Sequence, residues 1–253
     1  MVEPLIAAAL EAGARILEVR ASAVLGTTQK SDGSPVTLAD AAAEGAILPA
    51  LAAAFPGVPV VAEEEAAAGR IPEVGERFFL VDALDGTRDF VAGGDDFTVN
   101  IGLIEHGAPV AGVVYAPAHG VIFAGSRQHG ARRAEVVDGA PGAWRSIRVR
   151  TPPDDGYRIV ASRSHLDAKT RAFLDRQPGA EVVRSGSSLK FCTVAAGEAD
   201  LYPRFGPINE WDTAAGDAVL RAAGGVVTTH DGAPLTYGKP NFLNPPFFAR
   251  GAS

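Results

Sequence analysis

The most constraining feature of this chain is an apolar run that ends in two acids. The segment FFLVDALDGTRDF, residues 78–90, opens with apolar residues and then places Asp82 and Asp85 three positions apart. The apolar run predicts a buried strand, and ligands of α/β proteins bind where such strands end. Two carboxylates this close repel each other and resist burial unless a cation offsets them. The segment therefore predicts a cation at the end of the strand.

The chemistry of this segment favours magnesium and phosphate. Carboxylate oxygens suit Mg²⁺, which usually takes one or two of them together with water and substrate phosphate. Gly86 and Thr87 are predicted to open a short helix whose backbone N–H groups and dipole favour an anion. A helix cap explains the same residues, because Asp at an N-cap and Asp-Gly in a turn are both common.

Two further acid sites affect the choice between these explanations. The run AEEE at 62–65 follows a β-branched segment, and EWDTAAG at 210–216 places Asp212 at an expected helix start. A solvated turn explains the first by itself, and an N-cap explains the second. Three acid sites at the ends of elements in one chain fit a phosphate site with several metal ions better than three unrelated turns.

Composition excludes several other classes. The chain has 253 residues, 47% of them hydrophobic, which suits one large domain or two small lobes. A formal net charge of -7 argues against a nucleic-acid polymer as partner. The single cysteine, Cys192, excludes an intrachain disulfide and a cysteine-rich zinc site, and we interpret it as a core residue.

The N-terminal segment and the apolar runs bear on location. No apolar stretch reaches the roughly 20 residues of a membrane span. Glu3 and Glu11 interrupt the first 17 residues, which predict an amphipathic helix instead of a signal peptide. We therefore expect a cytoplasmic protein, with peripheral attachment to the inner face of the cell membrane and homodimer formation left open.

The pattern of elements differs between the two halves. In the first half we expect helices at 1–17 and 37–54, strands at 58–62 and 78–81, an antiparallel meander at 98–104, 110–115 and 121–124, and an exposed hairpin or loop at 131–144. In the second half, strands near 157–162, 181–185 and 199–205 alternate with helices near 168–176, from 187 and from 211. This pattern predicts an α/β (α+β) protein of two lobes, 1–150 with most metal ligands and 151–253 with Asp212 and the substrate side.

Several motifs together resemble a known family. VDALDGTRDF and EWDTAAG resemble the two signature motifs of the inositol monophosphatase superfamily, and the resemblance extends to KSDGSPVTLAD at 30–40 and VVAEEE at 60–65. It implies a layered αβαβα sandwich of the inositol monophosphatase and fructose bisphosphatase type. Ala83 departs from the usual proline without removing a ligand. GTRDF at 86–90, ASRSH at 161–165, SGSSLKFC at 185–192 and LYPRFGP at 201–207 are most similar to the CysQ-type 3'(2'),5'-bisphosphate nucleotidases.

The resemblance implies roles for particular residues. Two or three Mg²⁺ ions would be held by Glu63, Asp82, the Leu84 carbonyl, Asp85 and Asp212. Asp40 and Thr87 would orient and deprotonate the attacking water, with Glu63 also catalytic. The residues expected to bind substrate are Glu63, Leu84, Asp85, Gly86, Thr87, His165, Lys190, Arg204 and Asp212. The family also implies inhibition by Li⁺.

The three basic residues in that set have ordinary explanations. Lys190 and Arg204 can be solvated surface charges, and His165 can cap the helix that follows it. An enzyme for a bisphosphate nucleotide nevertheless needs cations for the phosphate that it does not cleave. We therefore predict all three as substrate contacts.

These observations lead to one function and two alternatives. The predicted function is Mg²⁺-dependent hydrolysis of the 3'-phosphate of adenosine 3',5'-bisphosphate, a by-product of sulfate assimilation. The first alternative is another phosphatase of the superfamily, acting on inositol or sugar phosphates. The second is a catalytically silent phosphate-binding regulator, although such a protein has no need of the full acid set.

Overall fold

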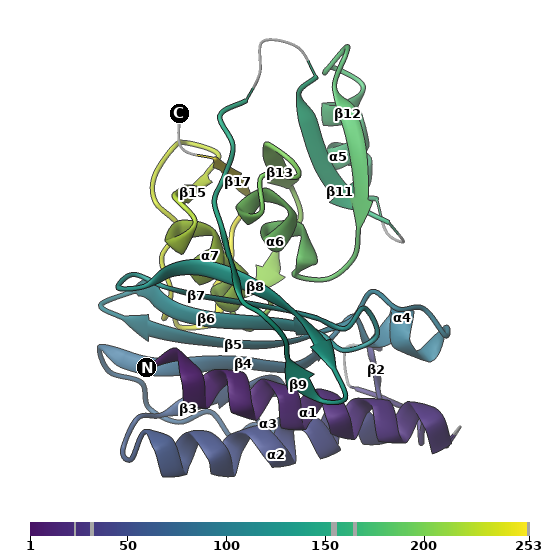
Figure 1. Ribbon diagram of the computed structural model, residues 1–253, viewed down its shortest axis with the longest axis vertical. Helices are drawn as coiled ribbons and strands as arrows, with labels where there is room; N and C mark the ends of the chain where they lie inside the picture. The colour runs from purple at the N-terminus through teal and green to yellow at the C-terminus, as the bar shows by residue number, and fades with distance from the viewer. Residues whose placement is uncertain (23, 31–32, 153–155, 164–165, 252–253) are drawn as a thin grey trace.

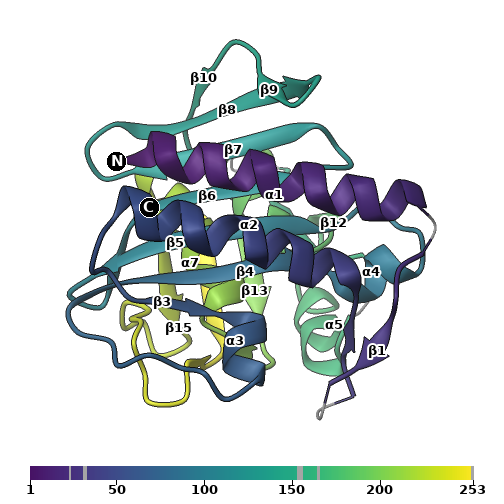
Figure 2. The same cartoon turned by 90° about the horizontal axis from the view of Figure 1, so that it is seen from below.

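The computed structural model describes residues 1–22, 24–30, 33–152, 156–163 and 166–251. Two long helices, α1 (Val2–Ser22) and α2 (Leu38–Ala54), lie side by side and cover one face of the larger sheet (Figure 2). Between them, β1 (Thr28–Gln29) and β2 (Pro35–Val36) form a short antiparallel pair. Leu5, Ile6 and Ile16 are buried as the helical pattern predicts. Leu17 falls near the same face of the helix by its spacing, but it is 36% exposed.

The larger sheet has eight strands in the described part of the chain, in the order β10-β8-β7-β6-β5-β4-β3 with β9 paired to β8. Its strands are β3 (Val60–Ala62), β4 (Arg77–Asp85), β5 (Thr98–Glu105), β6 (Ala108–Ala116), β7 (Val121–Ser126), β8 (Gly130–Val137), β9 (Ala140–Pro141) and β10 (Arg145–Ile147). Only the β3–β4 pair is parallel among these described strands, and β5, β6 and β7 form the predicted antiparallel meander.

A helix from the second half covers the other face of this sheet. Helix α7 (Trp211–Ala222) packs on β5, β6 and β7, with α6 (Leu189–Ala195) beside it. Glycines make this approach close: a Cβ on Gly112 would lie 2.6 Å from the Ala215 carbonyl oxygen of α7. Cys192 of α6 is fully buried in the core here, as predicted. The first residues of α7, which include Asp212, are thereby held against the end of the sheet.

The smaller sheet has five strands across the described ranges, in the order β12-β11-β13-β17-β15. Its strands are β11 (Arg158–Ser162), β12 (Glu181–Ser185), β13 (Leu201–Arg204), β15 (Gly225–Thr229) and β17 (Phe247–Gly251), and β14 (Ile208–Asn209) pairs separately with β16 (Leu243–Asn244). Helix α5 (Ala168–Leu174) packs on this sheet, where the Phe173 and Phe248 rings lie 5.8 Å apart between centroids.

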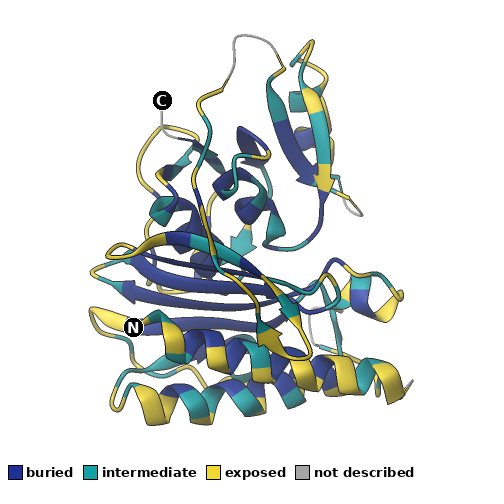
Figure 3. Cartoon of the chain, viewed as in Figure 1, coloured by how far each residue is buried: buried dark blue, intermediate teal, exposed yellow. Residues whose placement is uncertain are grey.

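The layers run helix, sheet, helix, sheet, helix (Figure 1), which confirms the αβαβα sandwich expected from the sequence. The sheets and α7 are largely buried, whereas the outward faces of α1 and α2 are exposed (Figure 3). None of the described helices is long and apolar enough to cross a membrane. The larger sheet ends at Ile147 and the smaller begins at Arg158, and α7 contacts strands of both sheets.

Candidate active site

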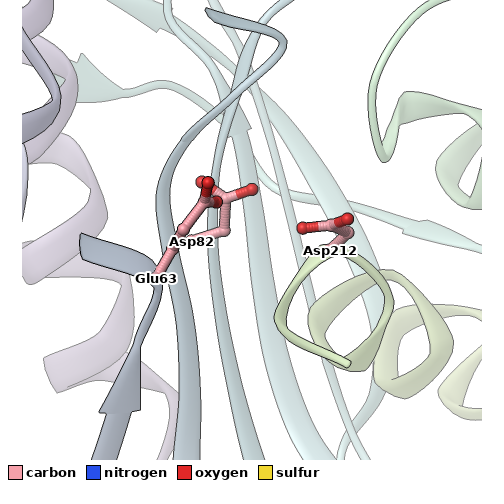
Figure 4. A group of neighbouring side chains, drawn as sticks. All are labelled: Glu63, Asp82 and Asp212. Atoms are coloured by element: carbon pink, nitrogen blue, oxygen red, sulfur yellow. The ribbon is translucent and has the colours of Figure 1, made fainter. Parts of the chain in front are cut away.

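Three carboxylates from distant parts of the chain meet beside the larger sheet. Glu63 opens the short helix α3 (Glu63–Ala67) directly after β3, Asp82 lies in β4, and Asp212 is the second residue of α7. One oxygen from each carboxylate lies within 4.8 Å of the other two. Figure 4 shows Glu63 and Asp82 pointing from one side toward Asp212 on the other. The three predicted acid sites therefore converge, and this could not be measured from spacing along the sequence.

A local irregularity in β4 places the acids of the DALDGT segment. Pairing with β5 is regular as far as Asp82 opposite Asn100 and resumes at Asp85 opposite Thr98, so β4 carries one extra residue. The Leu84 N–H donates to Asp82 Oδ1 at 2.9 Å, which fixes the bulge. Gly86 then turns the chain with a φ of 98°, and a Cβ there would lie 2.7 Å from the Asp96 carbonyl oxygen. Only glycine fits this turn, and α4 (Thr87–Val91) begins next.

Burial and mutual repulsion disfavour the ionised form of these carboxylates. Burial raises the pKa of Asp82 and of Asp212 well above the ordinary value, and the neighbouring charges of Glu63 and Asp85 raise both further. Burial likewise raises the pKa of Glu63. Such groups are expected to ionise fully only beside positive charge, and their oxygens are the hard ligands that divalent cations such as Mg²⁺ prefer. The donor set therefore fits a divalent metal.

Lys30 supplies positive charge here and was given no role from the sequence. Its ammonium lies 2.6 Å from Glu63 Oε1 and 2.5 Å from Glu64 Oε1. Burial opposes the charge, but the two carboxylates outweigh it and raise the pKa of the Lys30 ammonium. Its position at the start of KSDGSPVTLAD was the available signal. Lys30 holds Glu63 at the edge of the acid cluster.

Asp40 and Thr87, predicted to act on water, are hydrogen-bonded partners. Asp40 lies in the first turn of α2, where its Oδ2 accepts from the backbone N–H and the hydroxyl of Thr37, both at 2.7 Å. The Thr87 hydroxyl lies 3.2 Å from Asp40 Oδ1 and 3.0 Å from the Leu84 carbonyl oxygen. The capping box thus holds one Asp40 oxygen and leaves the other facing Thr87.

The remaining predicted metal ligands lie beside the close acid triple of Glu63, Asp82 and Asp212. Asp85 lines the same cavity of about 360 Å³ as Asp82 and Asp212, and Ser187 donates to its Oδ2 at 2.5 Å. The Leu84 carbonyl, also on the cavity wall, accepts from Thr87. Ser187 comes from the SGSS segment before α6, and sequence reasoning gave it no separate role. It connects the acid side of the cavity to the side formed by the second half of the chain.

Two of the three predicted basic residues line this cavity. Lys190 is buried, donates to the Ser187 carbonyl oxygen at 2.5 Å, and lies over the Tyr202 ring at 5.4 Å from its centroid. Arg204 Nη2 donates to the Pro207 carbonyl oxygen at 3.2 Å. Burial opposes the Arg204 charge, but Tyr202, Asp212 and Asp85 outweigh it and raise the pKa of the guanidinium. His165 lies outside the described residues.

A buried acid beneath α3 gives a pH-dependent prediction. Glu44 of α2 accepts from the Glu64 N–H at 3.1 Å, and burial with the nearby charges of Glu64 and Glu65 raises its pKa to about 7. Because this value exceeds the ordinary one, the stability that Glu44 contributes is complete below about pH 4.5 and is lost as pH rises through 7. We expect Glu44→Gln to raise the metal-free Tm by a few degrees at pH 8 and to change it little at pH 5.

The measurement is thermal unfolding in a chelator at both pH values. Glu73→Gln removes one negative charge from an exposed loop residue and serves as the matched control. A Glu44→Gln protein less stable than wild type at pH 8 would contradict the prediction, because the hydrogen bonds of the carboxylate would then outweigh its burial.

Comparisons with known proteins identify the family of this chain. Residues 1–250 match the Inositol monophosphatase family. The chain is 42% identical over 251 residues to the 3'(2'),5'-bisphosphate nucleotidase CysQ of Escherichia coli (strain K12), covering 98% of each. Among solved structures it is similar to CysQ from Bacteroides thetaiotaomicron, with a TM-score of 0.82 and 34% identity over 98% of this chain and 96% of that one. It is also similar to an inositol monophosphatase from Anabaena, with a TM-score of 0.76 and 30% identity over 100% of this chain and 90% of that one. The chain belongs to the inositol monophosphatase family.

Proposed function

We propose that this protein is a metal-dependent 3'(2'),5'-bisphosphate nucleotidase, which hydrolyses adenosine 3',5'-bisphosphate to AMP and phosphate. The observation that carries the proposal is one cavity lined by both acids and cations. Glu63, Asp82 and Asp212 line it together with Lys190 and Arg204. A nucleoside that carries phosphates on two positions of its ribose suits such a cavity, because one phosphate can meet metal ions at the acids and the other can meet the cations. Relatives with this activity are similar over nearly the whole chain.

Mg²⁺ is the proposed cofactor, with two or three ions per site. Glu63, Asp82, Asp85, Asp212 and the Leu84 carbonyl would hold them, because all five line the cavity and offer oxygen ligands. The bound ions would lower the pKa of the attacking water and offset the charge of the phosphate. Glu63 has a second role through Lys30, since that ion pair positions its carboxylate.

Thr87 and Asp40 act on the water from the side of α2. The Thr87 hydroxyl has one hydrogen and lies within hydrogen-bond distance of both the Leu84 carbonyl oxygen and Asp40 Oδ1. With the Leu84 carbonyl engaged as a metal ligand, that hydrogen would be donated to Asp40, which would leave an oxygen lone pair of Thr87 to accept a hydrogen bond from water in the cavity. Asp40 is buried and held by Thr37, so it keeps the hydroxyl in this orientation. As the water attacks phosphorus, its proton passes to Thr87 while the Thr87 proton moves to Asp40. The bond between phosphorus and the 3'-oxygen breaks, and the 3'-oxygen takes up a proton from solvent water to leave as the 3'-hydroxyl of AMP.

Lys190 and Arg204 bind the 5'-phosphate, which is not cleaved. Both line the same cavity as the acids, and a guanidinium pairs with phosphate through two parallel hydrogen bonds. Gly86 and Thr87 contact the phosphate that is cleaved. His165 is proposed for the same substrate from the ASRSH segment.

A phosphate-release assay tests the function. The purified protein with Mg²⁺ is given adenosine 3',5'-bisphosphate, inositol monophosphate and fructose bisphosphate in parallel. We expect the adenosine substrate to have the highest kcat/KM. A preference for inositol or sugar phosphates would support the alternative phosphatase, and no release from any substrate would support a silent regulator.

Charge reversal at Arg204 tests the substrate side separately. We expect Arg204→Glu to lower kcat/KM for adenosine 3',5'-bisphosphate at least ten- to a hundred-fold, because a lost charge-assisted contact costs roughly 1.5–3 kcal/mol. Inositol monophosphate has no second phosphate, so its turnover should change much less. Both substrates are measured with both proteins.

Two further variants complete that measurement. Arg204→Gln removes the charge without placing a new carboxylate near Asp212, and Arg148→Glu reverses an exposed arginine in the connection before β11. Equal losses on the two substrates with Arg204→Gln would mean that Arg204 supports the fold or the metal site. If Arg204→Glu and Arg148→Glu have the same kcat/KM on both substrates, Arg204 is a surface charge that does not contact the substrate.

A further inference from the structure

A buried acid two residues before Asp212 stands outside the catalytic cavity. Glu210 has 0% of its surface exposed, and it is not among the residues that line that cavity. Burying a carboxylate costs free energy unless the group is paired and hydrogen-bonded. The partners of Glu210 therefore decide what this buried acid does for the molecule.

Both oxygens of the Glu210 carboxylate bind one segment, residues 236–244, which follows β15 and includes β16. Oε2 accepts from the Gly238 N–H at 2.7 Å, and Oε1 accepts from the Lys239 N–H at 3.1 Å. The Lys239 ammonium also lies 2.6 Å from Oε1 and offsets its charge. The Glu210 N–H donates to the Phe242 carbonyl oxygen at 2.7 Å. Glu210 is thus bound to this segment through both its side chain and its backbone.

The 236–244 segment is attached in turn to the larger sheet. The Tyr237 N–H donates to the Gly107 carbonyl oxygen, in the turn between β5 and β6, at 3.0 Å. The Phe242 ring is buried 6.4 Å from the Phe78 ring of β4, measured between centroids. Phe242 has a φ of 48°, a left-handed conformation that persists only where surrounding contacts hold it. The segment therefore has a fixed place on the sheet to which β4 belongs.

Glu210 also organises the first turn of α7. It is the N-cap residue, and its carbonyl oxygen accepts from the Thr213 N–H at 3.1 Å and from the Ala214 N–H at 2.9 Å. Asn244 of the same segment donates to the Thr213 hydroxyl at 2.7 Å. The first turn of a helix leaves backbone groups without intrahelical partners, so outside contacts help to determine where it lies. Asp212 is the second residue of this turn.

The place of this turn matters because the acid triple joins two parts of the fold. Glu63 follows β3 and Asp82 lies in β4, whereas Asp212 faces them from α7 (Figure 4). The separation of the three carboxylates therefore depends on where α7 begins relative to the larger sheet. Groups that orient metal ligands affect metal affinity nearly as much as the ligands do, so a shift of α7 would weaken metal binding even with every ligand present.

We infer that Glu210 is a positioning residue of the metal site, which fixes Asp212 opposite the other two acids by anchoring the start of α7 to the 236–244 segment. The inference rests on the proposed function, in which Asp212 is a ligand of Mg²⁺. Glu210 lines no part of the cavity, so it acts through Asp212. Loss of a group that orients a metal ligand typically lowers metal affinity about 10- to 100-fold.

The test measures Mg²⁺ binding to the folded proteins by isothermal titration calorimetry. The test variant is Glu210→Gln, which keeps the size of the side chain and removes the charge that pairs with Lys239. The matched control is Asp200→Asn. Asp200 is also buried, accepts from the Arg158 N–H at 2.6 Å and pairs with Arg150 at 2.6 Å, but it precedes β13 and lies outside the catalytic cavity.

We expect Glu210→Gln to raise the Kd for Mg²⁺ about ten-fold, and Asp200→Asn to leave it within about two-fold of wild type. Both changes break a buried ion pair, so both should lower the Tm in a chelator by several degrees. At saturating Mg²⁺, the KM of Glu210→Gln for adenosine 3',5'-bisphosphate should stay within about two-fold of wild type, because Lys190 and Arg204 are unchanged. A residue that only stabilised the fold would lower the Tm without changing the Kd.

Lys239→Met tests the same anchor with a smaller change. Lys239 has 28% of its side chain exposed, so its replacement should leave a folded protein. The change removes the ion pair and keeps both backbone N–H contacts of Glu210, and we expect the Kd for Mg²⁺ to rise about three-fold. If Glu210→Gln does not fold, an unchanged Kd in Lys239→Met overturns the inference.

The outcomes that overturn the inference are separate from failure of the function. A Glu210→Gln protein with a lower Tm and a wild-type Kd would show that Glu210 only stabilises the fold. An equal rise in Kd with Asp200→Asn would show that any loss of stability weakens Mg²⁺ binding. Either result overturns the inference, while phosphate release by wild type keeps the proposed function. A wild-type protein that neither binds Mg²⁺ nor releases phosphate would overturn both.

Discussion

Replacing Asp82 by asparagine is expected to abolish turnover at any practical Mg²⁺ concentration. Asp82 is buried at the centre of the acid cluster, with an oxygen close to both Glu63 and Asp212. A metal ion would contribute several kcal/mol of transition-state stabilisation, so loss of the buried carboxylate that would hold it should lower kcat/KM by roughly 10⁴-fold. The measurement is phosphate release over a range of Mg²⁺ concentrations.

The same variant has an opposite effect on the metal-free protein. Because the pKa of Asp82 is raised by burial and by neighbouring carboxylates, its contribution to stability is present below its ordinary pKa and lost as pH rises through the raised value. Asp82→Asn removes one of the repelling charges, so its Tm in a chelator at neutral pH should exceed that of wild type. The rise in Tm that Mg²⁺ gives wild type should disappear.

A control separates this effect from loss of any acid nearby. Glu65→Gln changes a half-buried acid of the AEEE run, which pairs with Arg70 and stands outside the cluster of Glu63, Asp82 and Asp212. We expect this control to retain wild-type turnover and the Mg²⁺-dependent rise in Tm. Near-normal activity in Asp82→Asn would falsify the metal assignment.

Loss of the Thr87 hydroxyl or of the Asp40 charge is expected to lower kcat by about 10²–10³-fold with little change in KM. Proton transfer by a positioned group contributes roughly 10²–10⁴-fold, and the interaction exists mainly in the transition state. The variants are Thr87→Ala and Asp40→Asn. Neither residue belongs to the close acid triple, so both proteins should keep the rise in Tm with Mg²⁺.

A conservative variant makes this prediction specific. Thr87→Ser keeps a hydroxyl that can donate to Asp40 Oδ1, so it should retain kcat within about ten-fold of wild type. The measurement is steady-state kinetics with adenosine 3',5'-bisphosphate at saturating Mg²⁺. A steep rise in KM with kcat preserved would show that these residues bind substrate and that the proposed proton path is wrong.

Much of the fold followed from local pattern. The apolar runs of β4 to β7, the helical spacing in α1 and α2, and the alternation of strand and helix after Arg158 are properties of neighbouring residues. These patterns predicted those elements to within about five residues at each end. The segment 131–144 was expected only as an exposed hairpin or loop, but β8 pairs with β7 and β10 in the larger sheet, where Ala131 and Ala134 are buried. The exposed Leu17 is an exception, because helical spacing alone does not tell where a buried stripe ends.

Part of the site could also be predicted by its chemistry. Two acids after an apolar strand need a cation, and the glycine at 86 fits a turn that other residues cannot make. The motifs around Asp82, Asp212 and Asp40 carried the family resemblance, which the comparisons confirm. None of this required knowledge of distances.

Only the tertiary structure decided which side chains meet. Lys30 and Glu63 are ion-paired although 33 positions separate them, and Ser187 binds Asp85 across 102 positions. Local patterns contain no information on such pairs, because the packing of α2 and α7 on the larger sheet determines them. The same holds for Arg163, Arg184 and Arg204, which line one hollow because the parallel pairing of β11 with β12 and β13 brings the ends of three strands to one edge of the smaller sheet.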